Sequence, residues 1–169
     1  WFFASLSNST VEDNSAGYGS AISNSYITMT ITSSIVANPI EGINCTGPIA
    51  DGGYNISTDD TCGFLPENNS QPNTDPILGP LEDNGGNTPT HALLVGSPAI
   101  DTGDNALCPR IDQRGVTRPQ DGDNNGSAIC DIGAYEVKSL LIPPTAVVIT
   151  GSFAGYIGQP NNFSATLTP

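Results

Sequence analysis

The sequence contains very little positive charge. Four lysines and arginines stand against seventeen aspartates and glutamates in 169 residues, which gives a net charge of −13. A chain of this charge repels phosphate backbones and anionic lipid surfaces, so we expect no nucleic-acid partner. The sequence also lacks an apolar run of membrane-spanning length, so we expect no direct membrane insertion of this segment.

Helix-forming composition is scarce as well. Charged residues make up only 12% of the chain, whereas it contains 19 glycines and 14 prolines. Glycine and proline interrupt helices and gather in the turns of β proteins. The composition therefore predicts an all-β fold.

Cysteine is sparse, but the four cysteines form two local pairs, Cys45 with Cys62 and Cys108 with Cys130. Neither pair has the C-x-x-C spacing of a zinc site, and the chain has one histidine. Two disulfides within these pairs are the natural interpretation, and each would contribute roughly 3 kcal/mol. Because disulfides form in oxidising compartments, we expect a secreted, extracellular or cell-surface protein.

An internal repeat lies near the N-terminus. Residues 8–13 align with residues 33–38 at an offset of 25 residues, which is in the range of a solenoid repeat. Between the copies, Ile27, Met29 and Ile31 alternate with threonines, the period-two pattern of a strand with one buried face.

The copies end at asparagines, Asn14 and Asn38. Asparagine tolerates the left-handed backbone that a tight corner between stacked strands requires. The repeat therefore predicts stacked coils of strands. The alternative is an ordinary sheet of hairpins.

The rest of the chain divides into an irregular region and a tail. From Asn44 to Glu136 short apolar segments are separated by Gly, Pro and Asn, and a helix is conceivable only around residues 90–95. We therefore expect stacked coils and a cap over residues 1–138, a linker over 139–145, and the first strands of an incomplete sandwich over 146–169. Trp1-Phe2-Phe3 opens on an apolar cluster and residues 163–169 stop within a strand-like pattern, so we expect a piece of a longer polypeptide.

Residues 34–136 carry a dense set of short motifs. They are Ser34-Ile-Val-Ala-Asn38, Gly53-Tyr-Asn-Ile-Ser57, Asp59-Asp-Thr-Cys62, Asp75-Pro-Ile-Leu-Gly-Pro-Leu81, Asp83-Asn-Gly-Gly86, Thr88-Pro-Thr-His-Ala-Leu93, Gly96-Ser-Pro-Ala-Ile-Asp101, Asp112-Gln-Arg-Gly115 and Cys130-Asp-Ile-Gly-Ala-Tyr-Glu136. Together these motifs resemble the choice-of-anchor Q domain family of bacterial surface proteins. The resemblance implies the C-terminal coils of a right-handed parallel β-helix of the pectate-lyase-like superfamily, secretion and attachment to the cell envelope, and no settled catalytic activity. The tail from Thr145 resembles Ig-like or PKD-like repeats, which implies that residues 146–169 begin an Ig-like module.

One acidic loop has the spacing of a calcium site. The run Asp121-Gly-Asp-Asn-Asn-Gly126 fits the first half of a D-x-D-x-N-G loop, which places oxygens on alternate residues. Ile132 stands at the twelfth position instead of a bidentate glutamate, so Asp131 or a distant carboxylate would have to complete the shell. The sequence thus predicts calcium at Asp121, Asp123, Asn125 and Asp131, with a plain turn as the alternative.

Three arginines recur at every fourth residue, Arg110, Arg114 and Arg118. Gly115 and Pro119 favour a loop, in which guanidinium groups would bind carboxylates such as those of Asp101, Asp112 or Asp131. A catalytic alternative has Arg114 or Arg118 as the base beside a calcium-bound acidic sugar.

Hydrolase chemistry receives little support from the sequence. His91, Ser97 and Asp101 lie within eleven residues, but no Gly-x-Ser-x-Gly turn surrounds the serine. We therefore expect no catalytic residues and a non-catalytic structural or adhesive surface protein, in a surface assembly or filament, that binds other surface proteins, further copies of itself or glycans. The alternative is a secreted polysaccharide lyase or glycoside hydrolase with its active site on upstream coils.

Overall fold

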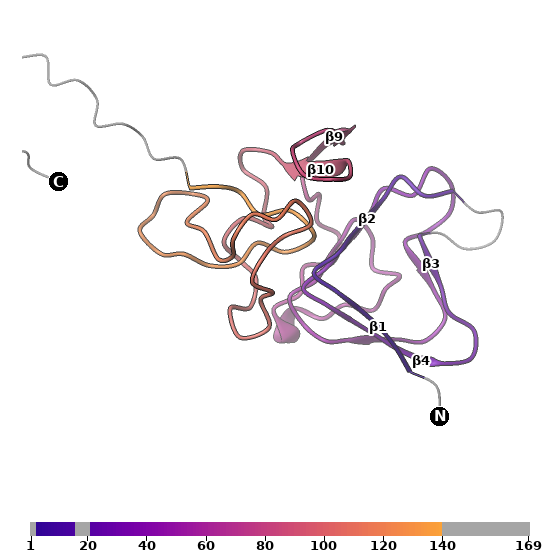
Figure 1. Ribbon diagram of the computed structural model, residues 1–169. Helices are drawn as coiled ribbons and strands as arrows, with labels where there is room; N and C mark the ends of the chain where they lie inside the picture. Colours follow the sequence, from indigo (N-terminus) through magenta and orange to yellow (C-terminus); the bar gives the residue numbers. More distant parts are fainter. Residues whose placement is uncertain (1–2, 16–20, 140–169) are drawn as a thin grey trace, which may run out of the picture.

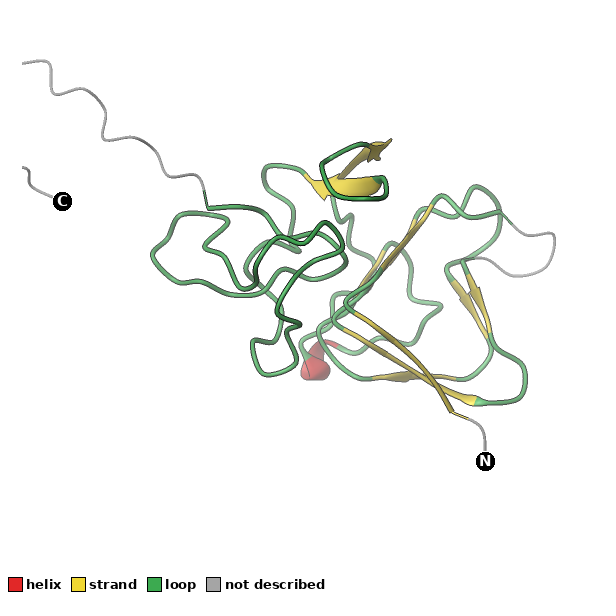
Figure 2. Cartoon of the chain, in the orientation of Figure 1, coloured by secondary structure: helices red, strands yellow, loops and turns green. Residues whose placement is uncertain are grey.

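The computed structural model describes residues 3–15 and 21–139 and is all-β, apart from one short 3-10 turn, η1 (Pro66–Asn68), in that part of the chain (Figures 1 and 2). The expected linker from residue 140 and the expected Ig-like module over 146–169 lie outside the described residues. No helix among the described residues is long and apolar enough to cross a membrane. The strands are β1 (Phe3–Ser7), β2 (Thr10–Glu12), β3 (Ile22–Ser23), β4 (Thr28–Thr32), β5 (Ile35–Ala37), β6 (Cys45–Thr46), β7 (Ile49–Asp51), β8 (Ile56–Ser57), β9 (Leu78–Glu82) and β10 (Thr90–Leu93).

The first eight strands form three parallel sheets, with the orders β1-β4-β7, β2-β5-β8 and β3-β6. Leu6 of β1 pairs with Ile31 of β4, and Ile31 pairs in turn with Asp51 of β7. Each strand therefore pairs with the equivalent strand of the next repeat and not with its neighbour in sequence. The hairpin-sheet alternative is wrong for this region. In Figure 1 the three sheets lie along three sides of a triangular outline.

The corners between the strands repeat in the backbone as well. Asn8 has a φ of +47° and Ser33, 25 residues later, has a φ of +49°, while Asp13 at +53° is matched by Asn38 at +42°. The left-handed corner expected at Asn38 is confirmed. In the first repeat Asp13, not Asn14, takes this conformation. The ladder pairs Glu12 with Ala37, so the residues that follow them, Asp13 and Asn38, occupy the same corner.

Apolar residues that point inward from the strands form the core. Ile31, Ile35, Val36 and Ile56 are fully buried. The strand expected from the alternation around Ile27, Met29 and Ile31 is confirmed as β4, and Ile31 is its most buried residue.

Residues 58–138, the irregular segment, are almost free of regular structure and contain the antiparallel pair β9–β10. The conceivable helix at residues 90–95 is wrong, because Thr90 and His91 pair with Glu82 and Leu81 across the hairpin. Disulfides join Cys45 to Cys62 and Cys108 to Cys130, the two pairs expected from the sequence.

The irregular segment packs directly on the parallel sheets. Ala99 and Ile132 form one buried cluster with Ile35 and Ile56. Gly133 donates its backbone N–H to the Ser33 carbonyl at 2.9 Å. The parallel sheets and the irregular segment therefore share a core.

Candidate functional site

The acidic loop at residues 121–126 is ordered by its own carboxylates. Asp121 accepts the backbone N–H groups of Asn125 at 3.0 Å and of Gly126 at 2.9 Å, one on each oxygen. Asp123 accepts the Asn125 N–H at 3.0 Å and its amide group at 2.9 Å. These bonds fold the loop around the two carboxylates, as the D-x-D-x-N-G spacing requires.

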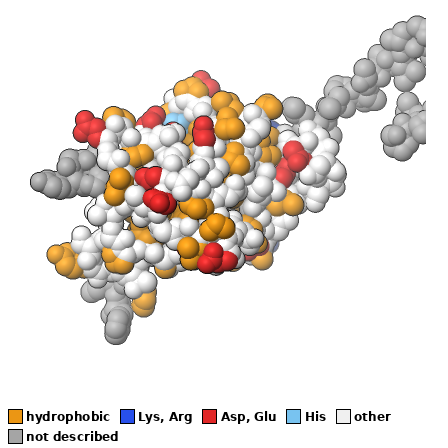
Figure 3. All heavy atoms as spheres, turned by 180° about the vertical axis from the view of Figure 1, so that it is seen from behind, with side chains coloured by type: hydrophobic (Ala, Val, Ile, Leu, Met, Phe, Trp, Pro, Cys, Tyr) orange, Lys and Arg blue, Asp and Glu red, His pale blue; other side chains and the backbone are white. Residues whose placement is uncertain are grey.

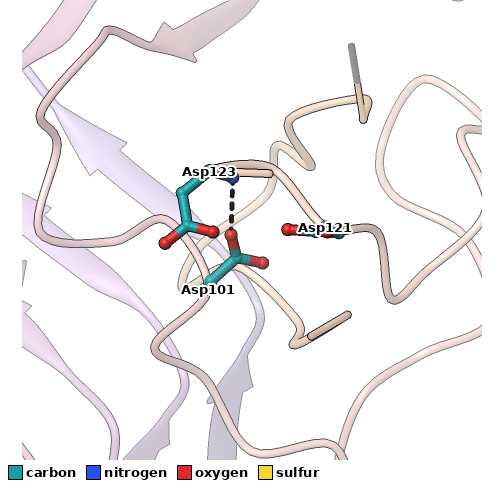
Figure 4. Close-up of side chains that lie close together, drawn as sticks. All are labelled: Asp101, Asp121 and Asp123. Carbon is teal, nitrogen blue, oxygen red and sulfur yellow. Dashed lines mark hydrogen bonds between the residues drawn. The ribbon is translucent and has the colours of Figure 1, made fainter. Parts of the chain in front are cut away.

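A third carboxylate, that of Asp101, reaches the same place from another part of the chain. Its Oδ2 accepts the Asp123 N–H at 2.8 Å. One oxygen from each of Asp101, Asp121 and Asp123 lies within 4.8 Å of the others. Figure 4 shows the three side chains converging, with the second Asp101 oxygen directed to the side of Asp121.

Burial distinguishes Asp101 from the other two acids. Its residue exposure is 8%, and its Oδ1 atom is buried without a hydrogen bond of standard geometry. Burial raises the pKa of Asp101, and the charge of Asp123 raises it further, against the opposing interactions with the backbone N–H groups of Asp123, Gly122 and Ile129. Asp121 is half-buried and Asp123 is exposed.

Asp131 positions Asp101 and does not join the group of three. Its two oxygens accept the Asp101 N–H at 2.8 Å and the Val137 N–H at 2.6 Å. Burial raises the pKa of Asp131 to about 7, with further contributions from the charges of Glu136 and Asp101. Of the four residues expected to bind calcium, the structure thus brings together Asp121 and Asp123.

Asn125 lies next to the group but uses its side chain within the loop. Its Oδ1 accepts the Ser127 N–H at 2.9 Å, and its Nδ2 donates to Asp123. The sequence reasoning missed Asp101 as a member of this group. No local motif marks it, because it lies twenty residues before the loop and is brought there by the bond to Asp131, thirty residues further along the chain.

Two of the three arginines make structural ion pairs, and the pair of Arg114 with Asp112 is among those expected, whereas Arg118 pairs with Glu136. Arg114 binds Asp112 at 2.7 Å and stacks on the Tyr135 ring at 3.4 Å. Arg118 is buried and lies 3.3 Å from Glu136 through its Nε atom, a contact without hydrogen-bond alignment. Burial lowers the pKa of Arg118, against the opposing charge of Glu136.

His91, Ser97 and Asp101, the three residues considered as a hydrolase triad, form hydrogen bonds with other groups and not with one another. Ser97 donates its hydroxyl to the Pro76 carbonyl at 2.6 Å, and His91 Nδ1 lies 2.8 Å from the Gly79 carbonyl. The Asp101 carboxylate faces the acidic loop. These three residues therefore do not form a nucleophile, base and orienting acid.

A polar groove of about 360 Å³ lies between β2 and the β9–β10 pair. Glu12, His91 and Gln113 are among its lining residues, and Glu12 is the one acidic residue among them. Glu12 receives an amide hydrogen bond from Asn38 at 3.0 Å, while its Oε2 is buried without a partner. Burial raises the pKa of Glu12, against the hydrogen bond from Asn38.

The comparisons with known proteins add no relative to this description. No family model matches the chain, and neither does any curated protein or any solved structure.

Proposed function

We propose that this chain is a non-catalytic structural segment of an extracellular surface protein, made of the C-terminal coils of a right-handed parallel β-helix and a cap. The support for coils is the parallel register, in which Leu6, Ile31 and Asp51 occupy equivalent positions in successive repeats. The two disulfides suit an oxidising, extracellular setting. The support for a cap is how residues 61–71 meet the last strand of every parallel sheet.

The first two closures involve β6 and β8. Cys45 of β6 donates its N–H to the Thr61 hydroxyl at 3.0 Å and forms the disulfide with Cys62. Ile56 of β8 makes a bridge with Gln71, and the Ser57 N–H donates to the Gln71 carbonyl at 3.1 Å. Backbone groups of β6 and β8 that could otherwise pair with another strand are therefore already bonded to the irregular segment.

The third closure involves β7 through a side chain. Asp51 accepts the Leu65 N–H at 2.9 Å, and beyond the strand Tyr54 donates its N–H to the Asn68 carbonyl at 3.1 Å. An uncovered strand edge is a template for another chain, and stacked repeats need terminal elements that end the stack. Occupation of the backbone of β6 and β8 by one irregular stretch, which also bonds to the Asp51 side chain at the end of β7, is the observation that carries the structural role.

Glycoside hydrolysis uses two carboxyl groups across one bond, whereas the groove between β2 and β9–β10 is lined by the single acid Glu12. The enzymatic alternative places its active site on upstream coils, so this groove bears only on activity of the described segment. The acidic side chains in Figure 3 are spread over the surface among polar and apolar atoms. We infer that the exposed surface serves contacts with other surface proteins, further copies of the chain or glycans.

Two measurements test the proposal. Amide hydrogen exchange of the 169-residue chain should protect Cys45, Tyr54 and Ser57, whose N–H groups donate to the irregular segment, about as strongly as Ile35 in the core. Unprotected amides at these three positions, with β4 and β5 protected, would contradict the cap. Incubation with acidic and neutral polysaccharides should yield neither unsaturated products nor new reducing ends, and either product would contradict the non-catalytic role.

A further inference from the structure

We propose that Asp101, Asp121 and Asp123 bind one calcium ion, with Asp101 as the ligand that joins the acidic loop to the buried interior of the irregular segment. This inference does not depend on the structural role proposed above. It begins from the spacing of the oxygens. Two oxygens bound to one calcium ion at about 2.4 Å lie at most about 4.8 Å apart, and the three carboxylates meet this limit.

Asp101 carries a buried oxygen atom that makes no hydrogen bond of standard geometry. A buried polar atom without a partner is rare, and it calls for a bound ion or water. Asp101 is 8% exposed, and its Oδ1 atom is such an unpartnered atom. Figure 4 shows that this oxygen is the one not used by the Asp123 N–H and that it is directed to the side of Asp121. The oxygen of a buried carboxylate that forms no hydrogen bond of standard geometry therefore faces the side of Asp121.

The three carboxylates have no positively charged side chain paired with them among the described residues. The two salt bridges among the described residues join Arg114 to Asp112 and Arg118 to Glu136, so neither neutralises this group. The loop N–H groups hold the carboxylates of Asp121 and Asp123 in place but bring no positive charge. A divalent cation supplies the missing charge, and calcium accepts the all-oxygen, partly exposed and flexible coordination that this loop offers.

Occupation of the site has a structural consequence. Asp101 donates its own N–H to Asp131, which also accepts the Val137 N–H. An ion held by Asp101 and the loop would therefore couple residues 121–126 to the end of the irregular segment. Because the ion binds only the folded arrangement, its presence should raise the stability of the whole unit.

Calorimetric titration of the chelator-treated 169-residue chain with calcium chloride tests the proposal. We expect one ion per chain with a Kd on the order of 10⁻⁴ to 10⁻³ M, the range of extracellular modules, and weaker binding of magnesium chloride. Asp101→Asn and Asp123→Asn should each weaken calcium binding by about tenfold or more, since each removes one of three charged ligands. Asp83→Asn is the matched control, because Asp83 also accepts a loop N–H, that of Gly85, outside this group.

The proposal can be tested even if Asp101→Asn, a substitution of a buried residue, prevents folding. Asp123 is exposed, so Asp123→Asn should leave the fold intact, and its circular dichroism checks this. The absence of saturable heat up to about 10 mM calcium, well above the affinities of extracellular sites, would overturn the proposal. So would an unchanged affinity in Asp123→Asn relative to Asp83→Asn, or equal affinity for magnesium.

Discussion

The carboxylate of Asp51, the last residue of β7, accepts the backbone N–H of Leu65 at 2.9 Å. The same carboxylate accepts hydrogen bonds from the Gly53 N–H and from the side chains of Asn55, Asn68 and Ser70. Five donors thus meet on one acid, at the point where the parallel sheets end and the irregular segment begins.

Asp51→Asn should lower the free energy of unfolding by about 2–3 kcal/mol, because the amide turns one acceptor into a donor that faces other donors. Urea unfolding followed by circular dichroism measures the change. Asp75→Asn is the control, since exposed Asp75 accepts one N–H, that of Ile77, and should cost less than about 1 kcal/mol. Equal effects of the two substitutions would contradict the role given to Asp51.

The contribution of Asp51 should depend on pH. Burial opposes ionisation, but the hydrogen bonds from Leu65, Gly53, Asn55 and Ser70 together outweigh it and lower the pKa of Asp51 below its ordinary value of 3.8. A lowered folded-state pKa stabilises the fold above the ordinary pKa, and this stability is lost as the pH falls through the folded value.

The stability difference between the native chain and Asp51→Asn should therefore be constant above about pH 5 and shrink below about pH 4. Using the difference removes the opposite effects of Asp131 and Glu136, whose pKa values burial raises. Urea unfolding at a series of pH values measures it. A difference that stays constant or grows towards low pH would show that these hydrogen bonds do not lower the pKa of Asp51.

Gly133 should be intolerant of a side chain. Its φ is +96°, and a Cβ atom there would lie 2.8 Å from Thr10 Oγ1 and 2.9 Å from Ile35 Cδ1, both on the parallel sheets. Gly96 has a similar φ of +86° with open space around it. Both alanine variants should carry backbone strain of about 1 kcal/mol, and Gly133→Ala should lose a further 1–3 kcal/mol, roughly, from the forced separation. Equal thermal stability of the two variants would argue against this close packing.

The two disulfides should differ in their resistance to reduction. Cys45 and Cys62 are each 2% exposed, whereas Cys108 is half-buried. Dithiothreitol under native conditions should therefore reduce Cys108–Cys130 first, as followed by alkylation and peptide mass spectrometry. Loss of either bond should cost about 2–4 kcal/mol. Earlier reduction of Cys45–Cys62 would contradict the packing of residues 61–71 against β6.

The sequence was sufficient where the information was local or repeated. The 25-residue offset predicted stacked strands, and the ladder pairs Thr10 with Ile35 at that offset. Near neighbours in sequence also identified both disulfide pairs. These features depend on one segment or on two copies of one segment, so pattern reasoning can detect them.

The features that the sequence did not predict depend on contacts between residues far apart in the chain. Thr90 has helix-compatible neighbours, but its partner is Glu82 in β9, so the segment is a strand. Asp101 joins the acidic loop through two long-range bonds, from its own N–H to Asp131 and from the Asp123 N–H to its carboxylate. The partner of Arg118 is Glu136, outside the three acids considered for it, since burial of both side chains is set by the packing of the irregular segment.

The central claim is that successive repeats stack in parallel. The most direct measurement is a set of through-space proton contacts in the NMR spectra of the isotopically labelled chain. Parallel stacking predicts backbone contacts between Leu6 and Ile31 and between Ile31 and Asp51, the register of β1, β4 and β7. Contacts between β1 and β2 in antiparallel register, in place of those between Leu6 and Ile31, would contradict it.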